Sequence, residues 1–216
     1  MWVLFDLNGT LVDPSGLVDD APEIGVTALD EANMMAMVTA LAGASAEFKP
    51  LLEAALRRGL ERAGRDPSLV TEAVSRLPSM PAYPEVPDAL SALRSGGVQL
   101  AVLTQSSADA AETVLANAGL RDHFELVLSA PDSGAFKPED LAYRYGLEQC
   151  NATEAWFVAG HWWDIAGAAF AGLRTAWISR TDRAYPTAMP PPDVHGADLS
   201  EVATALLSKP KADSPL

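Results

Sequence analysis

Short apolar runs alternate with helix-like segments through the second half of the sequence, and this alternation limits the fold more than any other feature. Apolar runs of strand length occupy residues 98–104, 124–130, 155–160 and 174–180, and helical patterns separate them at 107–119, 138–149 and 164–172. Such alternation is typical of βαβ units, in which parallel strands form one sheet covered by helices. The apolar run at residues 2–6 predicts a further strand of this sheet.

The segment that follows the first predicted strand has a different pattern. Residues 19–77 are rich in Ala, Leu, Met and Glu, and the stretch from Phe48 to Gly64 places its apolar side chains on one helical stripe. Gly64 stands where a helix would end, and Asp66-Pro67-Ser68 is a helix start signal. Four prolines within residues 77–90 predict a semi-rigid connector out of this helical region.

These two patterns together predict the domain organisation. We expect an α/β protein with a Rossmann-like parallel sheet flanked by helices and a small all-helical cap inserted after the first strand. The predicted segments are a core formed by residues 1–13 and 84–208, a cap formed by residues 14–83, and a flexible tail at 209–216.

Composition and charge narrow the class of protein. The 216 residues carry a net charge of −14, which argues against nucleic acid and anionic membranes as partners. There is no apolar run long enough to span a membrane, no basic signal-peptide start, and one cysteine, Cys150. We therefore expect a cytoplasmic monomer or homodimer that acts on a small-molecule substrate. No Lys, Arg or His precedes Lys49, so the early cap offers no cation to an anionic ligand.

Polar side chains follow the ends of the predicted strands, where ligands bind in open α/β sheets. In chain order they bring a carboxylate, hydroxyls, an ammonium and a second carboxylate, the groups that covalent catalysis uses. These residues are Asp6, Asn8, Thr10, Thr104, Gln105, Lys137, His161, Trp163 and Asp164.

Several of these residues also have a purely structural interpretation. Thr10 is of a type that closes turns, and Thr104 and Asp164 are of types that cap helices. Lys137 alone would be read as a surface lysine, and His161 as a structural or stacking residue. Asp6 is the exception, because a carboxylate directly after four apolar residues is poorly placed for capping alone.

The order and spacing of these residues resemble the haloacid dehalogenase (HAD) superfamily, and most closely its L-2-haloacid dehalogenase branch. The stretches that carry the resemblance include "PEVPDALSALRSGGVQLAVLTQSS", "FKPEDLAY" and "FVAGHWWDIAGAAFAGLRTAWISRT". The similarity covers residues 1–13 and about 81–181 and is weak across the helical cap.

The resemblance implies a role for each matching residue. Asp6 corresponds to the nucleophile, Thr10 and Thr104 would position it, and Lys137 would keep it ionised. Asp164, with His161 nearby, would hold Lys137 and the hydrolytic water. The residues expected to bind substrate are Asn8, Gln105, Tyr143, His161 and Trp163.

Three departures from the patterns of the superfamily bear on the reaction. Phosphatases of the superfamily have Asp at the position of Asn8, and an acid where Gly160 stands. Asn does not transfer protons, and a hard cation with few carboxylates binds weakly. We therefore expect no cofactor and no metal; a persisting Mg²⁺ site would use Asp6 and Asp164. The branch also has an Arg early in its cap, and the matching position here is Leu29.

The sequence therefore predicts a hydrolase that acts through a covalent aspartyl intermediate, with 2-haloacid dehalogenase-type hydrolysis of a carbon–halogen bond in a small organic substrate. Two alternatives remain open. One is a Mg²⁺-dependent small-molecule phosphatase or phosphonatase of the same superfamily, and the other is a catalytically inactive binding protein with the same fold.

Overall fold

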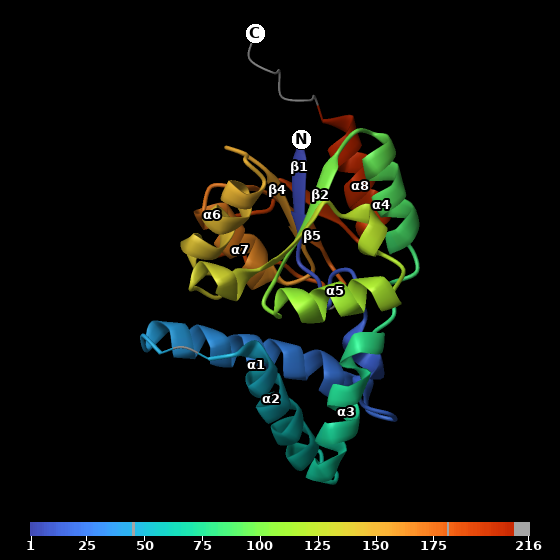
Figure 1. Ribbon diagram of the computed structural model, residues 1–216, viewed down its shortest axis with the longest axis vertical. Helices are drawn as coiled ribbons and strands as arrows, with labels where there is room; N and C mark the ends of the chain where they lie inside the picture. The colour runs from blue at the N-terminus through green and yellow to red at the C-terminus, as the bar shows by residue number, and fades with distance from the viewer. Residues whose placement is uncertain (45, 181, 210–216) are drawn as a thin grey trace.

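The computed structural model describes residues 1–44, 46–180 and 182–209. A single sheet of six parallel strands forms its centre, in the order β3-β2-β1-β4-β5-β6 (Figure 1). The strands are β1 (Trp2–Phe5), β2 (Gln99–Thr104), β3 (Leu126–Ser129), β4 (Trp156–Ala159), β5 (Arg174–Ile178) and β6 (Val194–Gly196). The expected α/β architecture with a parallel sheet is confirmed.

Helices cover both faces of the sheet, and the alternation of side chains along the strands explains how. On β1, Val3 and Phe5 pack into one apolar cluster with α4, α5 and α8, while Leu4 packs into a second cluster with α6 and α7. The helices are α4 (Val86–Ser95), α5 (Ala108–Asn117), α6 (Asp140–Gln149), α7 (Trp162–Phe170) and α8 (Leu199–Ser208).

The segment between β1 and α4 folds into helices that pack around a third apolar cluster (Figure 1). They are α1 (Pro22–Leu41), α2 (Phe48–Arg62) and α3 (Val70–Arg76), with short 3₁₀ turns at Pro14–Leu17, Pro67–Leu69 and Leu77–Ser79. Gly64 follows α2 with a φ of +66°, and the Asp66 carboxylate accepts from the N–H of Ser68, as the start and stop signals predict. This helical part faces the carboxyl ends of the strands.

Three features differ from the sequence-based expectations or lie beyond them. The predicted connector at 77–90 is already helical from Val86, because Pro87 is tolerated in the first turn of α4. Strand β6 and helix α8 were not predicted; β6 has only three residues, too few for a recognisable pattern. Residues 210–216 of the predicted tail lie outside the described residues. None of the described helices has the length and apolar character that crossing a membrane requires.

Candidate active site

Asp6 stands directly after β1, at the carboxyl edge of the sheet. Its backbone N–H donates to the Val158 carbonyl of the neighbouring strand, and the residue is only 6% exposed. The chain turns at Gly9, which has a φ of +76°, and this turn brings the Thr10 hydroxyl back to donate to Asp6 Oδ2 over 2.8 Å. Thr10 Oγ1 also accepts from the N–H of Gly160, so it connects the loops after β1 and β4.

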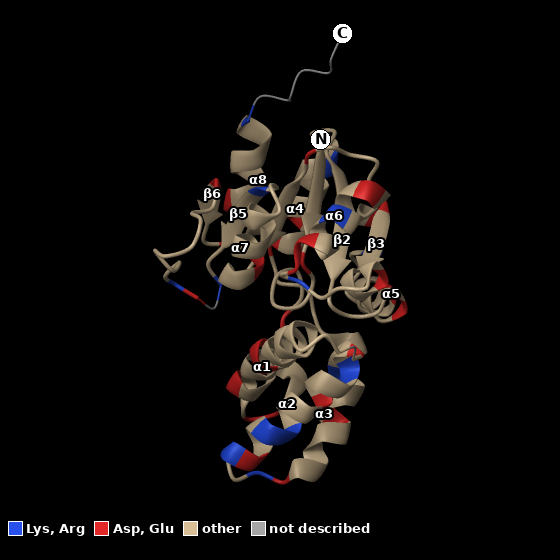
Figure 2. Cartoon of the chain, turned by 90° about the vertical axis from the view of Figure 1, so that its left-hand side faces the viewer, with Lys and Arg blue, Asp and Glu red and all other residues tan. Residues whose placement is uncertain are grey.

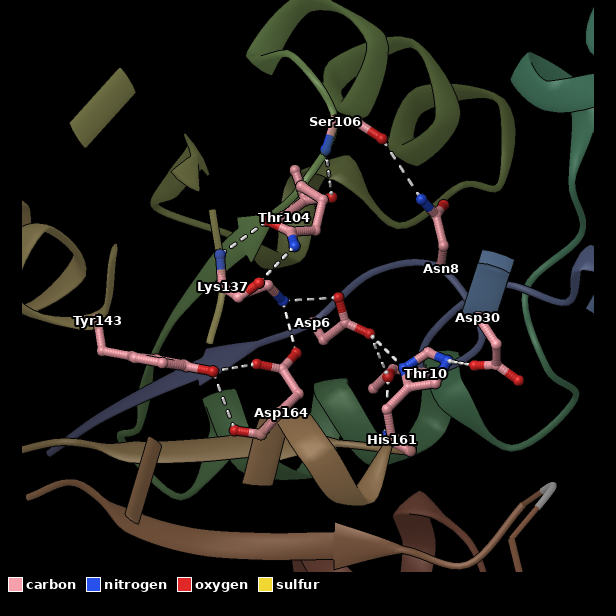
Figure 3. Close-up of polar contacts among 12 residues, drawn as sticks. Asp6, Asn8, Thr10, Asp30, Thr104, Ser106, Lys137, Tyr143, His161 and Asp164 are labelled. Carbon is pink, nitrogen blue, oxygen red and sulfur yellow. Dashed lines mark hydrogen bonds and ion pairs between the residues drawn. The ribbon is translucent and has the colours of Figure 1, made fainter. Parts of the chain in front are cut away.

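The Lys137 ammonium lies between two carboxylates (Figure 3). The ammonium donates to Asp6 Oδ1 over 2.9 Å and to Asp164 Oδ2 over 2.6 Å, and the Lys137 side chain is fully buried. The Tyr143 hydroxyl donates to Asp164 Oδ1 over 2.6 Å. Both carboxylate oxygens of Asp164 therefore accept a hydrogen bond, and Asp6 and Asp164 share a single ammonium.

The charges in this group shift one another's pKa values. Burial raises the pKa of Asp6, but the charge of Lys137 and the contact with His161 outweigh it, so the pKa falls well below the usual range. Burial lowers the pKa of Lys137, but Asp164 and Asp6 raise it overall. Burial raises the pKa of Asp164 and also that of Tyr143. Asp6 is consequently an ionised carboxylate throughout the neutral range.

His161 approaches Asp6 from the other side and connects it to the helical part. It precedes α7, and its Nδ1 lies 3.3 Å from Asp6 Oδ2 while its Nε2 lies 3.7 Å from Asp30 Oδ1 on α1. The Trp163 ring lies tilted over the imidazole, with centroids 5.5 Å apart. Burial lowers the pKa of His161, but the contact with Asp6 and the charges of Asp6 and Asp30 raise it overall.

Three predicted residues reach partners other than Asp6. The Gln105 side chain forms two hydrogen bonds with the backbone of Lys137, and Thr104 Oγ1 accepts from the N–H of Ser106. Asn8 donates from Nδ2 to Ser106 Oγ over 3.4 Å, and its Oδ1 is buried without a partner among the described residues. Figure 3 shows a tight group formed by Asp6, Thr10, Lys137, Tyr143, His161 and Asp164, with Asn8 and Thr104 at its edge. Gln105 joins this group through the backbone of Lys137.

The structure adds two residues that sequence reasoning missed. Asp30 approaches His161 from α1, and nothing in the local pattern of that helix marks it. Arg180 follows β5; its Nε donates to the Thr10 carbonyl over 3.0 Å, and its Nη2 pairs with Glu85 over 2.5 Å. Its position at the end of a predicted strand could have marked Arg180 as a candidate site residue. Arg180 therefore stabilises the loop that follows Asp6, and Glu85 neutralises its charge.

Two spaces of different size lie between the helical part and the sheet. The larger, a crevice of about 370 Å³, has Asn8, Gln105 and Ser106 on the sheet side and Phe48 and Leu52 on the helical side. The smaller is a hollow of about 10 Å³ bounded by residues that include Gly9, Leu29, Asp30, Gly160 and His161. The crevice has room for a small organic molecule, whereas the hollow has room for about one water.

The donor set fits a divalent cation poorly. The Lys137 ammonium stands between Asp6 and Asp164, and both Asp164 oxygens are engaged. A Cβ at Gly160 would lie 2.7 Å from the Gly9 carbonyl oxygen, so an acid does not fit there without a shift of the loop. Among the described residues no group of three His, Cys, Asp or Glu side chains has a metal-binding arrangement.

Comparison with known proteins gives three results. The model of the haloacid dehalogenase-like hydrolase family matches residues 1–172. An (S)-2-haloacid dehalogenase of Pseudomonas sp. (strain YL) is 31% identical over 93% of this chain and 91% of its own length. A phosphoserine phosphatase of Thermus thermophilus is 33% identical over 86% of this chain and 77% of its own length.

A solved structure agrees with the fold. The L-2-haloacid dehalogenase of Xanthobacter autotrophicus superposes with a TM-score of 0.86 over 96% of this chain and 98% of its own, at 22% identity. A second structure of that enzyme carries covalently bound chloropropionic acid.

Proposed function

The chain belongs to the haloacid dehalogenase-like hydrolase family, and from this membership we propose that it hydrolyses the carbon–halogen bond of a small organic substrate. The proposed reaction proceeds through a covalent ester on Asp6 and uses no metal. The relative from Pseudomonas sp. (strain YL), a 2-haloacid dehalogenase by name, supports this class of reaction.

In the first step an oxygen of the Asp6 carboxylate attacks the carbon that bears the halogen. The C–O bond forms as the carbon–halogen bond breaks, and the halide departs with the bonding electrons. Lys137 keeps Asp6 ionised for this attack, while Asp164 and Tyr143 hold Lys137 in place. Water then hydrolyses the ester at the Asp6 carbonyl carbon, which releases the hydroxylated product and restores the carboxylate.

The observation that carries the proposal is the combination of an ionised Asp6 with the amide of Asn8. Asn8 lies two residues after the nucleophile and donates to Ser106. An amide does not protonate a departing alkoxide, so hydrolysis of a phosphate ester would lack its acid. A halide leaves without a proton, and the residues present are sufficient for it.

The phosphatase alternative is favoured by one specific observation, the similarity to the phosphoserine phosphatase of Thermus thermophilus. It requires a metal site, which the Lys137 ammonium and the Gly160 backbone disfavour here. The two reactions are separated by their products, since one releases halide and the other inorganic phosphate.

The test is a screen for halide release over chlorinated and brominated small acids, amides and alcohols, with Asp6→Asn as the matched inactive control. Release by the wild type that the variant lacks supports the proposal. Mg²⁺-dependent release of phosphate from an aryl phosphate, without halide release, would establish the phosphatase instead. Ligand-induced stabilisation without turnover of any substrate would indicate a binding protein.

A further inference from the structure

His161 has contacts that the alkylation step does not require. We propose that His161 is the base that takes a proton from the water that hydrolyses the Asp6 ester, with Asp30 holding the imidazole in position. This inference rests on the proposed function, because it concerns the second step of that reaction.

The imidazole is held in one place by its surroundings. Its side chain is 16% exposed, with Nδ1 facing Asp6 Oδ2 at 3.3 Å and Nε2 facing Asp30 Oδ1 at 3.7 Å. Gly9 gives it room, since a Cβ there would lie 3.0 Å from His161 Cε1. Once esterification removes the charge of Asp6, the Asp30 carboxylate beside Nε2 favours the tautomer with its proton on that nitrogen, which leaves the Nδ1 lone pair directed at the ester.

The other polar groups around Asp6 are unsuited to accept this proton. Asp164 is fully buried, with Oδ2 engaged by Lys137 and Oδ1 by Tyr143. Lys137 is a cation whose pKa is raised by Asp164 and Asp6 against the effect of burial. Asn8 carries an amide, which is not a base at neutral pH. Among the described residues that contact Asp6, His161 therefore remains as the proton acceptor: its buried Nδ1 forms no hydrogen bond with the described residues, and its side chain bounds the small hollow.

The size of that space favours water over substrate. The hollow bounded by Gly9, Asp30, Gly160 and His161 has a volume of about 10 Å³, enough for about one water molecule. The substrate-sized crevice lies on the Asn8 side of the site. The hollow is bounded by His161 and the crevice by Asn8, so water and substrate have separate spaces next to the loop that carries Asp6.

The proton and the electrons balance with the residues present. The water oxygen forms a bond to Asp6 Cγ, and the water proton passes to Nδ1 of His161. The bond between Cγ and the ester oxygen then breaks, and its electron pair stays on the product oxygen, which takes the proton back from His161. The Asp6 carboxylic acid formed in this way loses its proton to solvent, because Lys137 again stabilises the carboxylate.

The charge change of Asp6 supports the same role. Burial lowers the pKa of His161. The contact with Asp6 and the negative charge of Asp6 are the largest causes that raise it. Esterification removes the charge of Asp6, so the pKa of His161 falls when the ester forms. The loss of this charge favours the neutral imidazole at the stage of the reaction at which a base is needed.

The test compares His161→Gln with the wild type on a substrate found by the halide screen, with the substrate in excess. We expect the variant to release about one equivalent of halide per protein and then stop, with the ester on Asp6 visible by mass spectrometry. Steady-state turnover should fall at least about 100-fold, since general bases typically contribute 10²–10⁴-fold. Asp30→Asn should slow the decay of the ester and leave the rate of the initial halide release unchanged.

His123→Gln is the matched control, because His123 lies in a turn remote from Asp6 and should turn over like the wild type. Steady-state turnover by folded His161→Gln within about threefold of the wild type would overturn the role of His161, and so would loss of the first equivalent of halide. In both cases the proposed function would stand. Absence of halide release from the wild type would instead remove the proposed function and the base with it.

Discussion

The side chain of Gln105 holds the backbone of Lys137 at both of its polar groups. Gln105 Nε2 donates to the Lys137 carbonyl over 2.9 Å, and the Lys137 N–H donates to Gln105 Oε1 over 3.0 Å. Both residues are buried, so this pair of hydrogen bonds fixes the segment from which the Lys137 ammonium reaches Asp6. Gln105 was predicted to bind substrate; it lines the crevice, and its side chain also positions Lys137.

Gln105→Leu should therefore lower both stability and activity. The Lys137 N–H and carbonyl would remain buried without partners, at a cost of about 1–3 kcal/mol each in the free energy of unfolding. Urea unfolding measures the loss, and halide release measures the effect on turnover. Gln99→Leu, an exposed change at the start of β2, is the control. Equal unfolding free energies for the two variants would contradict the positioning role.

Lys137→Met should destabilise the protein in a pH-dependent way. Removal of the ammonium leaves the buried carboxylates of Asp6 and Asp164 without the cation that they share, which costs about 3–5 kcal/mol. Their pKa values would then be raised above those of the unfolded chain, so the stability deficit should shrink as the pH falls and grow as it rises. Unfolding free energies at pH 5 and pH 8 measure this.

The control for that variant is Lys49→Met, because Lys49 forms an exposed pair with Glu53. Its unfolding free energy should stay within about 0.5 kcal/mol of the wild type at both pH values. A deficit of Lys137→Met that is independent of pH would contradict the account of the paired carboxylates.

Activity should survive removal of divalent cations. The ammonium of Lys137 stands between Asp6 and Asp164, and Tyr143 takes the remaining oxygen of Asp164. Halide release in the presence of EDTA should equal that of the untreated protein, and added Mg²⁺ should not increase it. A strict dependence of turnover on added Mg²⁺ would instead support the phosphatase reaction.

The substrate should carry less negative charge than a haloacid. Among the described residues that line the crevice, Lys49 is the one Lys or Arg, and Glu47 and Asp132 outnumber it. Figure 2 shows basic residues on the helical part. Arg58 and Arg62 of α2 pair with Glu31, and Arg76 of α3 pairs with Asp19 and Glu72. The KM for a haloacetate should therefore exceed about 1 mM, the upper end of the usual range, while its amide binds more tightly.

Glu47→Lys tests the origin of this preference. It reverses a charge at the crevice, so it should lower the KM for the haloacid and leave that for the amide unchanged. Glu61→Lys makes the same change in net charge at the far end of α2 and should alter neither value. A wild type that already prefers haloacids to their amides would contradict the charge argument.

Much of the site follows from the sequence because parallel strands end at one edge of a sheet. Asp6, Thr104 and Asp164 could be expected to meet there once the strands were recognised, although their separation along the chain is large. The contact of His161 with Asp30 could not be predicted, because it depends on how the helical part packs against the sheet. The partner of Gln105 was also hidden, since a backbone acceptor leaves no signal in the sequence.

The central claim is that Asp6 forms the covalent intermediate, and isotope transfer tests it most directly. In a single turnover with protein in excess in H₂¹⁸O, water attacks the carbonyl carbon of the ester, so the label should enter the Asp6 carboxylate. The peptide that contains Asp6 should gain one ¹⁸O by mass spectrometry, and the first product formed should contain ¹⁶O. Product that carries ¹⁸O from the first turnover, with an unlabelled Asp6 peptide, would show direct attack by water and contradict the account.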